Sequence, residues 1–133
     1  KDSSIFERDA LHLFKFAEIH LGQGNLTLAR GYYNELAVKH PESPLARYSK
    51  LRILDIRAIR LLNQDSYKDL PSLIDPLTSI TASNNGDINA MIAIRRAHWS
   101  KEGQAKEYDK AYLPNISEDV YNSLSGGILV ASR

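Results

Sequence analysis

Apolar residues recur every three or four positions along most of the chain, which is the spacing of one face of an α-helix. This pattern predicts helices over residues 5–22, 26–39, 44–63, 67–80, 87–101 and 103–112, with a further one starting near residue 120. Glycines, prolines and polar runs separate these segments, and no alternating strand pattern appears before residue 115. The sequence therefore predicts an all-α fold.

Several helix ends carry clear local signals. Gly24 is expected to end the first helix, since glycine adopts the left-handed conformation at little cost. Ser43 is a candidate N-cap for the third helix, with Pro44 in the favoured first helical position. The segment 67–80 contains two prolines, Pro71 and Pro76, and either is expected to break it.

Apolar groups fall on more than one side of the segments 5–22 and 44–63. Helices with this pattern are usually packed between two neighbours. Helix pairs begin near residues 10, 44 and 85, so they follow one another at intervals of about 34 and 41 residues. The order of helices thus predicts a repeat architecture.

The first pair resembles a tetratricopeptide repeat over residues 10–43. Its bulky, small and aromatic residues, its turn glycine and its closing proline occupy the family's positions in register: Leu13, Phe16, Ala17, His20, Gly24, Ala29, Tyr33 and Pro41. The two alanines let the helices approach closely, and the larger side chains are expected to fill the seam around them. His20 holds a packing position of the family, so a core role is expected for it.

The later pairs depart from the family pattern. In the second, Leu51 stands where a small residue belongs, and the turn glycine is absent. In the third, Trp99 and Gly103 are displaced from the expected places. The first pair therefore carries most of the resemblance.

The resemblance implies a right-handed superhelical stack of about three tetratricopeptide-like helix hairpins. The pairs would occupy residues 5–41, 44–80 and 87–114, within one repeat domain over residues 1–114. Residues 115–133 would then form a C-terminal cap or a linker.

A narrower likeness lies in the junction between the first two pairs. The segment at residues 40–46, with its two prolines, a serine and an alanine, is similar to a linker of tetratricopeptide proteins in bacterial cell envelopes. Those relatives include outer-membrane assembly lipoproteins and Tol–Pal accessory proteins, which are non-enzymatic adaptors. The likeness implies a periplasmic or outer-membrane-associated location, and a cytoplasmic location remains the alternative because cytosolic members share the linker.

Family members bind partners along the concave wall formed by the first helix of each pair. Carried over to this chain, the groove positions are Leu11, Phe14, Glu18, Leu21, Tyr48, Arg52 and Asp55. Such a groove suits an apolar helix or an extended segment with one acidic group, with Arg52 as its ion-pair partner. Two alternatives stay open. The apolar residues can instead be buried against a further helix that is not part of this sequence. The cations of the third helix can simply extend from a packed helix into solvent.

Charge and residue types exclude several classes of function. The 133 residues carry 17 basic and 16 acidic side chains, and a net charge of +1 argues against a nucleic-acid partner. The chain has no cysteine, which excludes disulfides and thiolate metal sites. Its four histidines never stand at the i, i+4 spacing of a helical metal site, and no apolar run is long enough to span a membrane.

No nucleophile, acid–base pair or metal set emerges, so the sequence favours a non-enzymatic protein that uses no cofactor or metal. We expect an adaptor or scaffold that binds a protein or peptide through the concave face of the stack, in bacterial envelope assembly. The alternative is a structural or regulatory segment of a larger protein that acts mainly by homodimerisation. A solution mass near 15.0 kDa or near twice that value separates the two.

Overall fold

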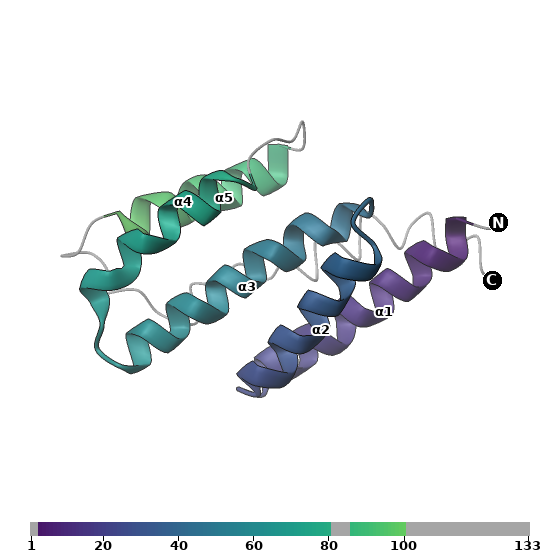
Figure 1. The fold of residues 1–133 in the computed structure, drawn as a ribbon, viewed down its shortest axis with the longest axis horizontal. Helices are drawn as coiled ribbons and strands as arrows, with labels where there is room; N and C mark the ends of the chain where they lie inside the picture. Colours follow the sequence, from purple (N-terminus) through teal and green to yellow (C-terminus); the bar gives the residue numbers. More distant parts are fainter. Residues whose placement is uncertain (1–2, 81–85, 101–133) are drawn as a thin grey trace. The chain divides into compact units, whose positions relative to one another are not determined.

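The computed structural model describes residues 3–80 and 86–100, and the regular elements within these ranges are all helical (Figure 1). They are α1 (Ser3–Gly22), α2 (Leu26–Lys39), α3 (Pro44–Asn63), the 3₁₀ helix η1 (Tyr67–Leu73), α4 (Ile74–Thr78) and α5 (Gly86–Trp99). The predicted all-α class is confirmed for these ranges. The helices predicted over 103–112 and near residue 120, and the predicted cap or linker over 115–133, lie outside the described residues.

The chain divides into two compact units. The first comprises residues 1–49 and 115–133, and the second comprises residues 50–114. The division falls within α3, whose first residues therefore belong to the first unit and whose remainder belongs to the second. Each unit is described separately below.

In the first unit, α1 and α2 form an antiparallel hairpin joined by a three-residue turn (Figure 1). Ala17 of α1 and Ala29 of α2 are both fully buried. Two aromatic rings pack in the same seam: Phe14 meets Tyr33 edge to face, with ring centroids 5.7 Å apart. The small residues permit a close helix approach, and the aromatic pair fills the space beside them. Phe16, which the sequence predicted in this seam, is instead 49% exposed, and Phe14 takes its place.

The turn after α1 is a Schellman motif. Asn25 donates its backbone N–H to the carbonyl of His20 at 2.8 Å, and Gly24 donates to Leu21 at 3.0 Å. These bonds satisfy carbonyls that have no partner within the helix. The motif requires a left-handed residue, and Gly24 supplies it with φ +80°. The sequence-based assignment of this glycine is confirmed.

The same motif ends α3, but here an aspartate takes the left-handed position. Ser66 donates to the carbonyl of Leu61 at 2.8 Å, and Asp65 donates to Leu62 at 3.1 Å. The φ of Asp65 is 56°, in the left-handed region, where the Cβ atom comes too close to the backbone carbonyl oxygen that follows it. The chain thus contains two equivalent helix ends that differ in the residue at the strained position.

This difference predicts opposite effects for two substitutions. Asp65→Gly should raise the free energy of unfolding by about 1 kcal/mol, because glycine adopts positive φ without strain. Gly24→Ala should lower it by about the same amount. Urea unfolding followed by circular dichroism measures both, and two changes of the same sign would contradict the assignment.

The junction between α2 and α3 is organised by caps. Ser43 Oγ accepts a hydrogen bond from the backbone N–H of Leu45 at 3.1 Å, and Pro44 is the first residue of α3. The predicted N-cap and first-turn proline are therefore confirmed. At the end of α2, His40 donates its backbone N–H to the carbonyl of Leu36 at 2.8 Å. The turn between the helices thus has its ends fixed by local hydrogen bonds.

In the second unit, the segment after α3 differs from the single helix predicted over 67–80. It is a 3₁₀ helix that contains Pro71, followed by the short α4 that contains Pro76. Proline lacks the N–H that an α-helix interior needs. The segment does break, but the boundary falls between Leu73 and Ile74 and not at either proline. α4 packs against α5. The buried side of α5 carries Ile88, Met91, Ile92, Arg95 and Trp99.

Candidate functional site

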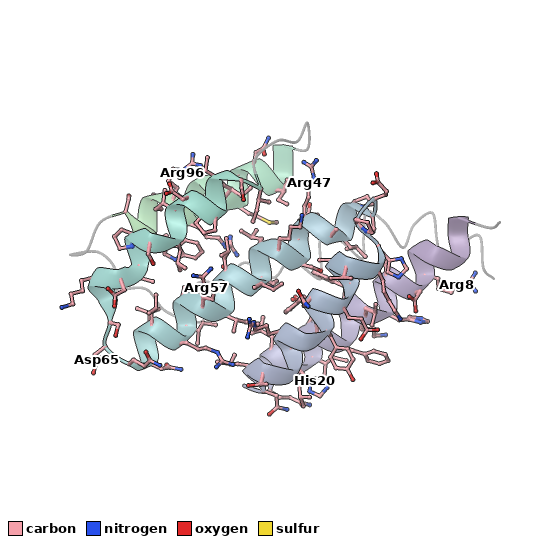
Figure 2. All side chains as sticks on the ribbon, in the orientation of Figure 1. Arg8, His20, Arg47, Arg57, Asp65 and Arg96 are labelled. Carbon is pink, nitrogen blue, oxygen red and sulfur yellow. The ribbon has the colours of Figure 1, made fainter. Side chains whose placement is uncertain are left out.

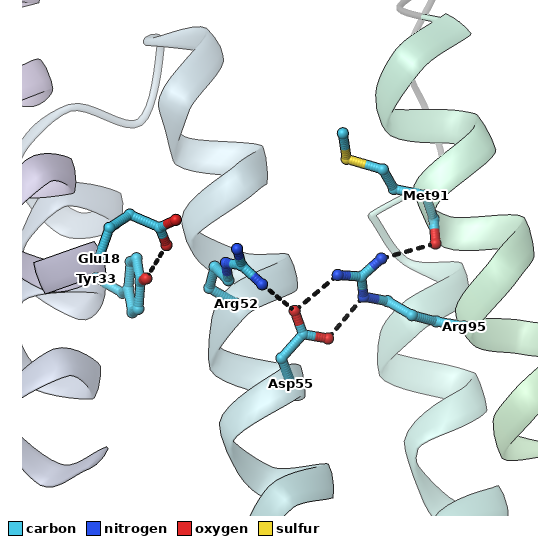
Figure 3. A network of polar contacts seen from close by, with 6 residues as sticks. All are labelled: Glu18, Tyr33, Arg52, Asp55, Met91 and Arg95. Carbon is cyan, nitrogen blue, oxygen red and sulfur yellow. Dashed lines mark hydrogen bonds and ion pairs between the residues drawn. The ribbon is translucent and has the colours of Figure 1, made fainter. Parts of the chain in front are cut away.

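Most of the residues predicted to line a groove are buried in this structure. In the first unit, Leu11, Phe14 and Tyr48 are buried. Glu18 and Leu21 are partly exposed. The Tyr33 hydroxyl donates a hydrogen bond to Glu18 Oε2, so this carboxylate helps to close the α1–α2 seam (Figure 3). Leu11, Phe14 and Tyr48 therefore form part of the packed interior of this unit.

The two predicted groove residues of the second unit, Arg52 and Asp55, are also buried. Asp55 is 0% exposed and accepts hydrogen bonds from two arginines (Figure 3). Arg95 approaches its carboxylate with both Nε and Nη2, at 2.6 and 2.8 Å, and Arg52 Nη1 lies 3.2 Å from Oδ2. Arg95 Nη1 also donates to the carbonyl of Met91 at 3.0 Å. We call Arg52, Asp55 and Arg95 the buried ion cluster.

The buried ion cluster connects α3 to α5. Its bidentate arginine–carboxylate geometry is the strongest form of this ion pair. A buried carboxylate without partners would be very unfavourable, and the two guanidinium groups supply those partners. Arg52 and Asp55 thus act within the second unit in this structure, and they do not offer an ion pair to a ligand at the surface.

Sequence reasoning did not find the part played by Arg95. No role for Arg95 was predicted from the sequence, yet its side chain is almost fully buried. A signal was present: Arg95 stands four residues after Met91 and four before Trp99, on the apolar side of α5. A charged residue in an apolar stripe calls for a buried partner of opposite charge, and Asp55 lies 40 residues away in the sequence.

The cations of α3 fall into distinct environments. Lys50, Arg57 and Arg60 are exposed, and Arg47 is partly buried. Lys50, Arg57 and Arg60 fit the expectation of long side chains that extend from a packed helix into solvent. Arg47 does not, because its Nη1 atom is buried. Arg52 alone among the five is buried, and its ion pair with Asp55 explains why.

The hairpin of the first unit exposes large apolar side chains along one flank. Phe16, Ile19 and Leu28 are 49%, 46% and 53% exposed. The ring of Tyr32 contacts Phe16 at 5.8 Å between centroids and stacks on His20 at 5.5 Å, with an interplanar angle of 8°. Leu28 lies one helical turn before Tyr32, on the same side of α2. We call these five residues the aromatic flank; His20 marks its place in Figure 2.

The aromatic flank has a fixed internal geometry. His20 is held on two sides, by the Tyr32 ring and by Asn25, whose Nδ2 lies 3.4 Å from His20 Nδ1. The ring of His20 is partly buried, so it supports the exposed aromatic side chains. Side chains that are already ordered lose little conformational entropy when a partner covers them. The flank is the largest group of exposed apolar side chains that one hairpin presents in the described ranges.

No family model matches the chain, and no curated protein or solved structure is significantly similar to it. The function must therefore be argued from the residues themselves.

The first unit has two further features, a hollow beside α2 and a histidine–carboxylate contact. On the side of α2 opposite the seam, Thr27, Arg30, Gly31 and Asn34 line a hollow of about 330 Å³. These four residues include no acid–base pair. At the other end of the hairpin, His40 Nε2 lies 2.6 Å from Asp9 Oδ2. The imidazole is buried and the carboxylate is half-exposed, so this contact fastens the end of α2 to α1.

The described residues offer neither a cluster of metal ligands nor a membrane-spanning helix. Across residues 3–80 and 86–100, no group of three or more His, Asp or Glu side chains is arranged to hold a metal ion. Within the same ranges, no helix has the length and apolar character needed to cross a membrane. The aromatic flank therefore remains the strongest candidate site of the described structure.

Proposed function

We propose that this chain is a non-enzymatic protein-interaction module, built from tetratricopeptide-like helix hairpins, that binds a protein or peptide partner through the aromatic flank. The observation that carries the proposal is the exposure of Phe16, Ile19 and Leu28 beside the ordered ring of Tyr32. Contiguous exposed apolar side chains of this kind mark interaction surfaces, and aromatic residues are enriched at the centres of interfaces.

The hairpin supports the tetratricopeptide assignment. Ala17 and Ala29 are fully buried where the family places small residues, and Gly24 is left-handed where it places a turn glycine. Tyr33 is buried at the family's aromatic position. A superhelical stack of about three such hairpins remains part of the proposal.

The proposed contact differs from the concave groove expected from the sequence. Leu11, Phe14, Tyr48, Arg52 and Asp55 are buried, so a partner would reach them only by displacing their neighbours. The aromatic flank is accessible without any such change. We therefore place the first contact with a partner on the flank.

The envelope location is proposed on the linker alone. The similarity of residues 40–46 to the linker of envelope adaptors supports a periplasmic or outer-membrane-associated module. Ser43 in this segment caps α3, and this structural role does not depend on the cellular compartment. A cytoplasmic module therefore remains the alternative, and fractionation of the native host distinguishes the two.

Selection from a random peptide library on the immobilised protein tests the function. We expect peptides with an apolar face to be enriched and to bind with dissociation constants on the order of micromolar. Phe16→Glu should weaken their binding about tenfold or more, because a charge then occupies the centre of the contact. Fluorescence anisotropy measures the affinities.

Val38→Asp provides the matched control. Val38 is on α2 and is 71% exposed, but it lies about 15 Å further along that helix than Leu28 and about a quarter of a turn round it. This variant should bind selected peptides as the wild type does. Equal affinities for Phe16→Glu and the wild type would refute binding through the flank, and a library that yields no binding peptide would count against the proposed function itself.

A further inference from the structure

The rim of the aromatic flank carries an exposed cation, Lys15. This lysine stands on α1 one helical turn before Ile19, so the two side chains lie on the same side of that helix. The carboxylate one turn further along α1, that of Glu18, accepts the hydrogen bond of the Tyr33 hydroxyl instead. Across residues 3–80 and 86–100, no hydrogen bond or ion pair is formed by the Lys15 ammonium group. Its charge is therefore available to a group outside the chain.

The carboxylates beside the flank, by contrast, have partners within the chain. Glu35 lies on the flank's side of α2, and its Oε2 is 3.2 Å from Lys39 Nζ. Asp9 lies two turns before Phe16 on α1, and its Oδ2 is 2.6 Å from His40 Nε2. The charge that the described rim leaves unpaired is thus positive, and it is complementary to an acidic partner.

The area of the flank suits a short segment of a partner. Half-exposed side chains of this size contribute roughly 100 Å² each, so the four apolar members supply on the order of 400 Å². A stable interface between folded proteins uses about 800 Å² on each side. The flank extends over about one turn of α1 and one turn of α2. The apolar face of a helical segment of about two or three turns matches such a surface.

We propose that the aromatic flank binds a short amphipathic helix of a partner protein, whose apolar face is bordered by glutamate or aspartate. The inference rests on the proposed function, since it names the chemical character of the partner. Apolar side chains of the partner cover Phe16, Ile19 and Leu28, and a carboxylate at the border forms an ion pair with Lys15. The apolar contact supplies most of the affinity, and the ion pair selects acidic over basic partners.

An anionic lipid surface fits the flank less well than an acidic helix does. Lipid surfaces are bound by clusters of about four or more lysines or arginines beside apolar side chains. Among the described cations of α1 and α2, Lys39 is paired with Glu35. Arg30 lies on the opposite side of α2 from Leu28, and Arg8 is partly buried. The single unpaired cation of the rim therefore favours one acidic segment over a charged surface.

Three synthetic peptides test the chemistry of the partner. They share one helical face of leucines and differ only in the residues beside that face, which are glutamate, glutamine or lysine. Fluorescence anisotropy should show that the glutamate peptide binds tightest and the lysine peptide weakest, with about a fivefold difference in dissociation constant between them. Raising the NaCl concentration from about 50 to 500 mM should bring the three affinities together, because salt screens exposed charges.

Lys15→Glu should invert this order, because the lysine peptide then meets an opposite charge at the rim. Arg30→Glu is the matched control, since it makes the same change in net charge on the side of α2 opposite Leu28 and Tyr32. It should keep the order of the wild type. Both positions are exposed, so both variants should keep the helical circular dichroism signal of the wild type. An order that is unchanged in Lys15→Glu, or that is inverted in Arg30→Glu as well, overturns the inference.

The inference and the proposed function fail in different ways. If the three peptides bind the wild type equally but Phe16→Glu weakens all of them, the flank binds by apolar contact alone and only the acidic partner is excluded. If none of the three peptides binds, the inference is overturned, and the library selection decides the proposed function by itself. Binding to phosphatidylserine-containing vesicles that is lost in Lys15→Glu, without any preference among the peptides, would assign the flank to a lipid surface and overturn the inference.

Discussion

Asp55→Asn is expected to lower the free energy of unfolding by about 3–5 kcal/mol. The substitution keeps the size of the side chain but removes the only negative charge of the buried ion cluster. The guanidinium groups of Arg95 and Arg52 then lose their shared carboxylate in a site that is closed to water. Since domains of this size have total stabilities of about 5–15 kcal/mol, the loss would be a large fraction of the whole. Urea unfolding followed by circular dichroism measures it.

Two further variants control this measurement. Asp75→Asn removes an exposed carboxylate of α4 and should change the stability by no more than about 0.5 kcal/mol. The double variant Asp55→Leu with Arg95→Met replaces the main ion pair by apolar side chains, and it should lose clearly less than Asp55→Asn does. A loss below about 1 kcal/mol for Asp55→Asn would mean that the cluster is open to solvent.

Phe14→Asp is the second substitution for which a large effect is expected. Phe14 is fully buried against Tyr33, so the aspartate would place a charge in the seam and remove the aromatic packing. Replacing a buried phenylalanine even by alanine costs about 3–5 kcal/mol, and an unpaired charge adds to that cost. We expect a protein that is largely unfolded at room temperature, with most of its helical circular dichroism signal lost.

Phe16→Asp is the matched control for this prediction. It lies two residues further along α1, carries the same change of side chain and is about half exposed. Its cost should be about 1 kcal/mol, so the variant stays folded. If both variants unfold to the same extent, Phe16 belongs to the core, and the aromatic flank is not available to a partner.

The helices could be predicted from the sequence because their signals are local. The three-to-four-residue spacing placed α2 and α3 at the observed bounds. The glycine at residue 24 identified the end of α1, and the serine and proline at residues 43 and 44 identified the start of α3. A break within residues 67–80 was likewise expected from the two prolines, although the change of helix type comes after Leu73 and at neither proline. The 3₁₀ geometry that replaces the helix depends on packing and was not foreseen.

The surroundings of the side chains could not be obtained in the same way. Arg52 and Asp55 look like surface residues in the sequence, and their burial depends on Arg95, which is 40 positions from Asp55. The apolar character of Phe14 and Phe16 is the same, yet one is fully buried and the other is half exposed. Tertiary packing decides which side of a helix faces a neighbour. The sequence shows only which side chains are apolar enough to be buried.

The continuity of α3 across the two compact units affects how such a chain can be rearranged. The division between the units falls between residues 49 and 50, inside the helix, so a cut there would leave carbonyl and N–H groups without partners on both pieces. The turns at residues 40–43 and 64–66 already have their ends satisfied by caps and Schellman bonds. Insertions, permuted termini and fragment exchanges should therefore be tolerated at these turns, which makes the helix hairpin the natural unit of recombination.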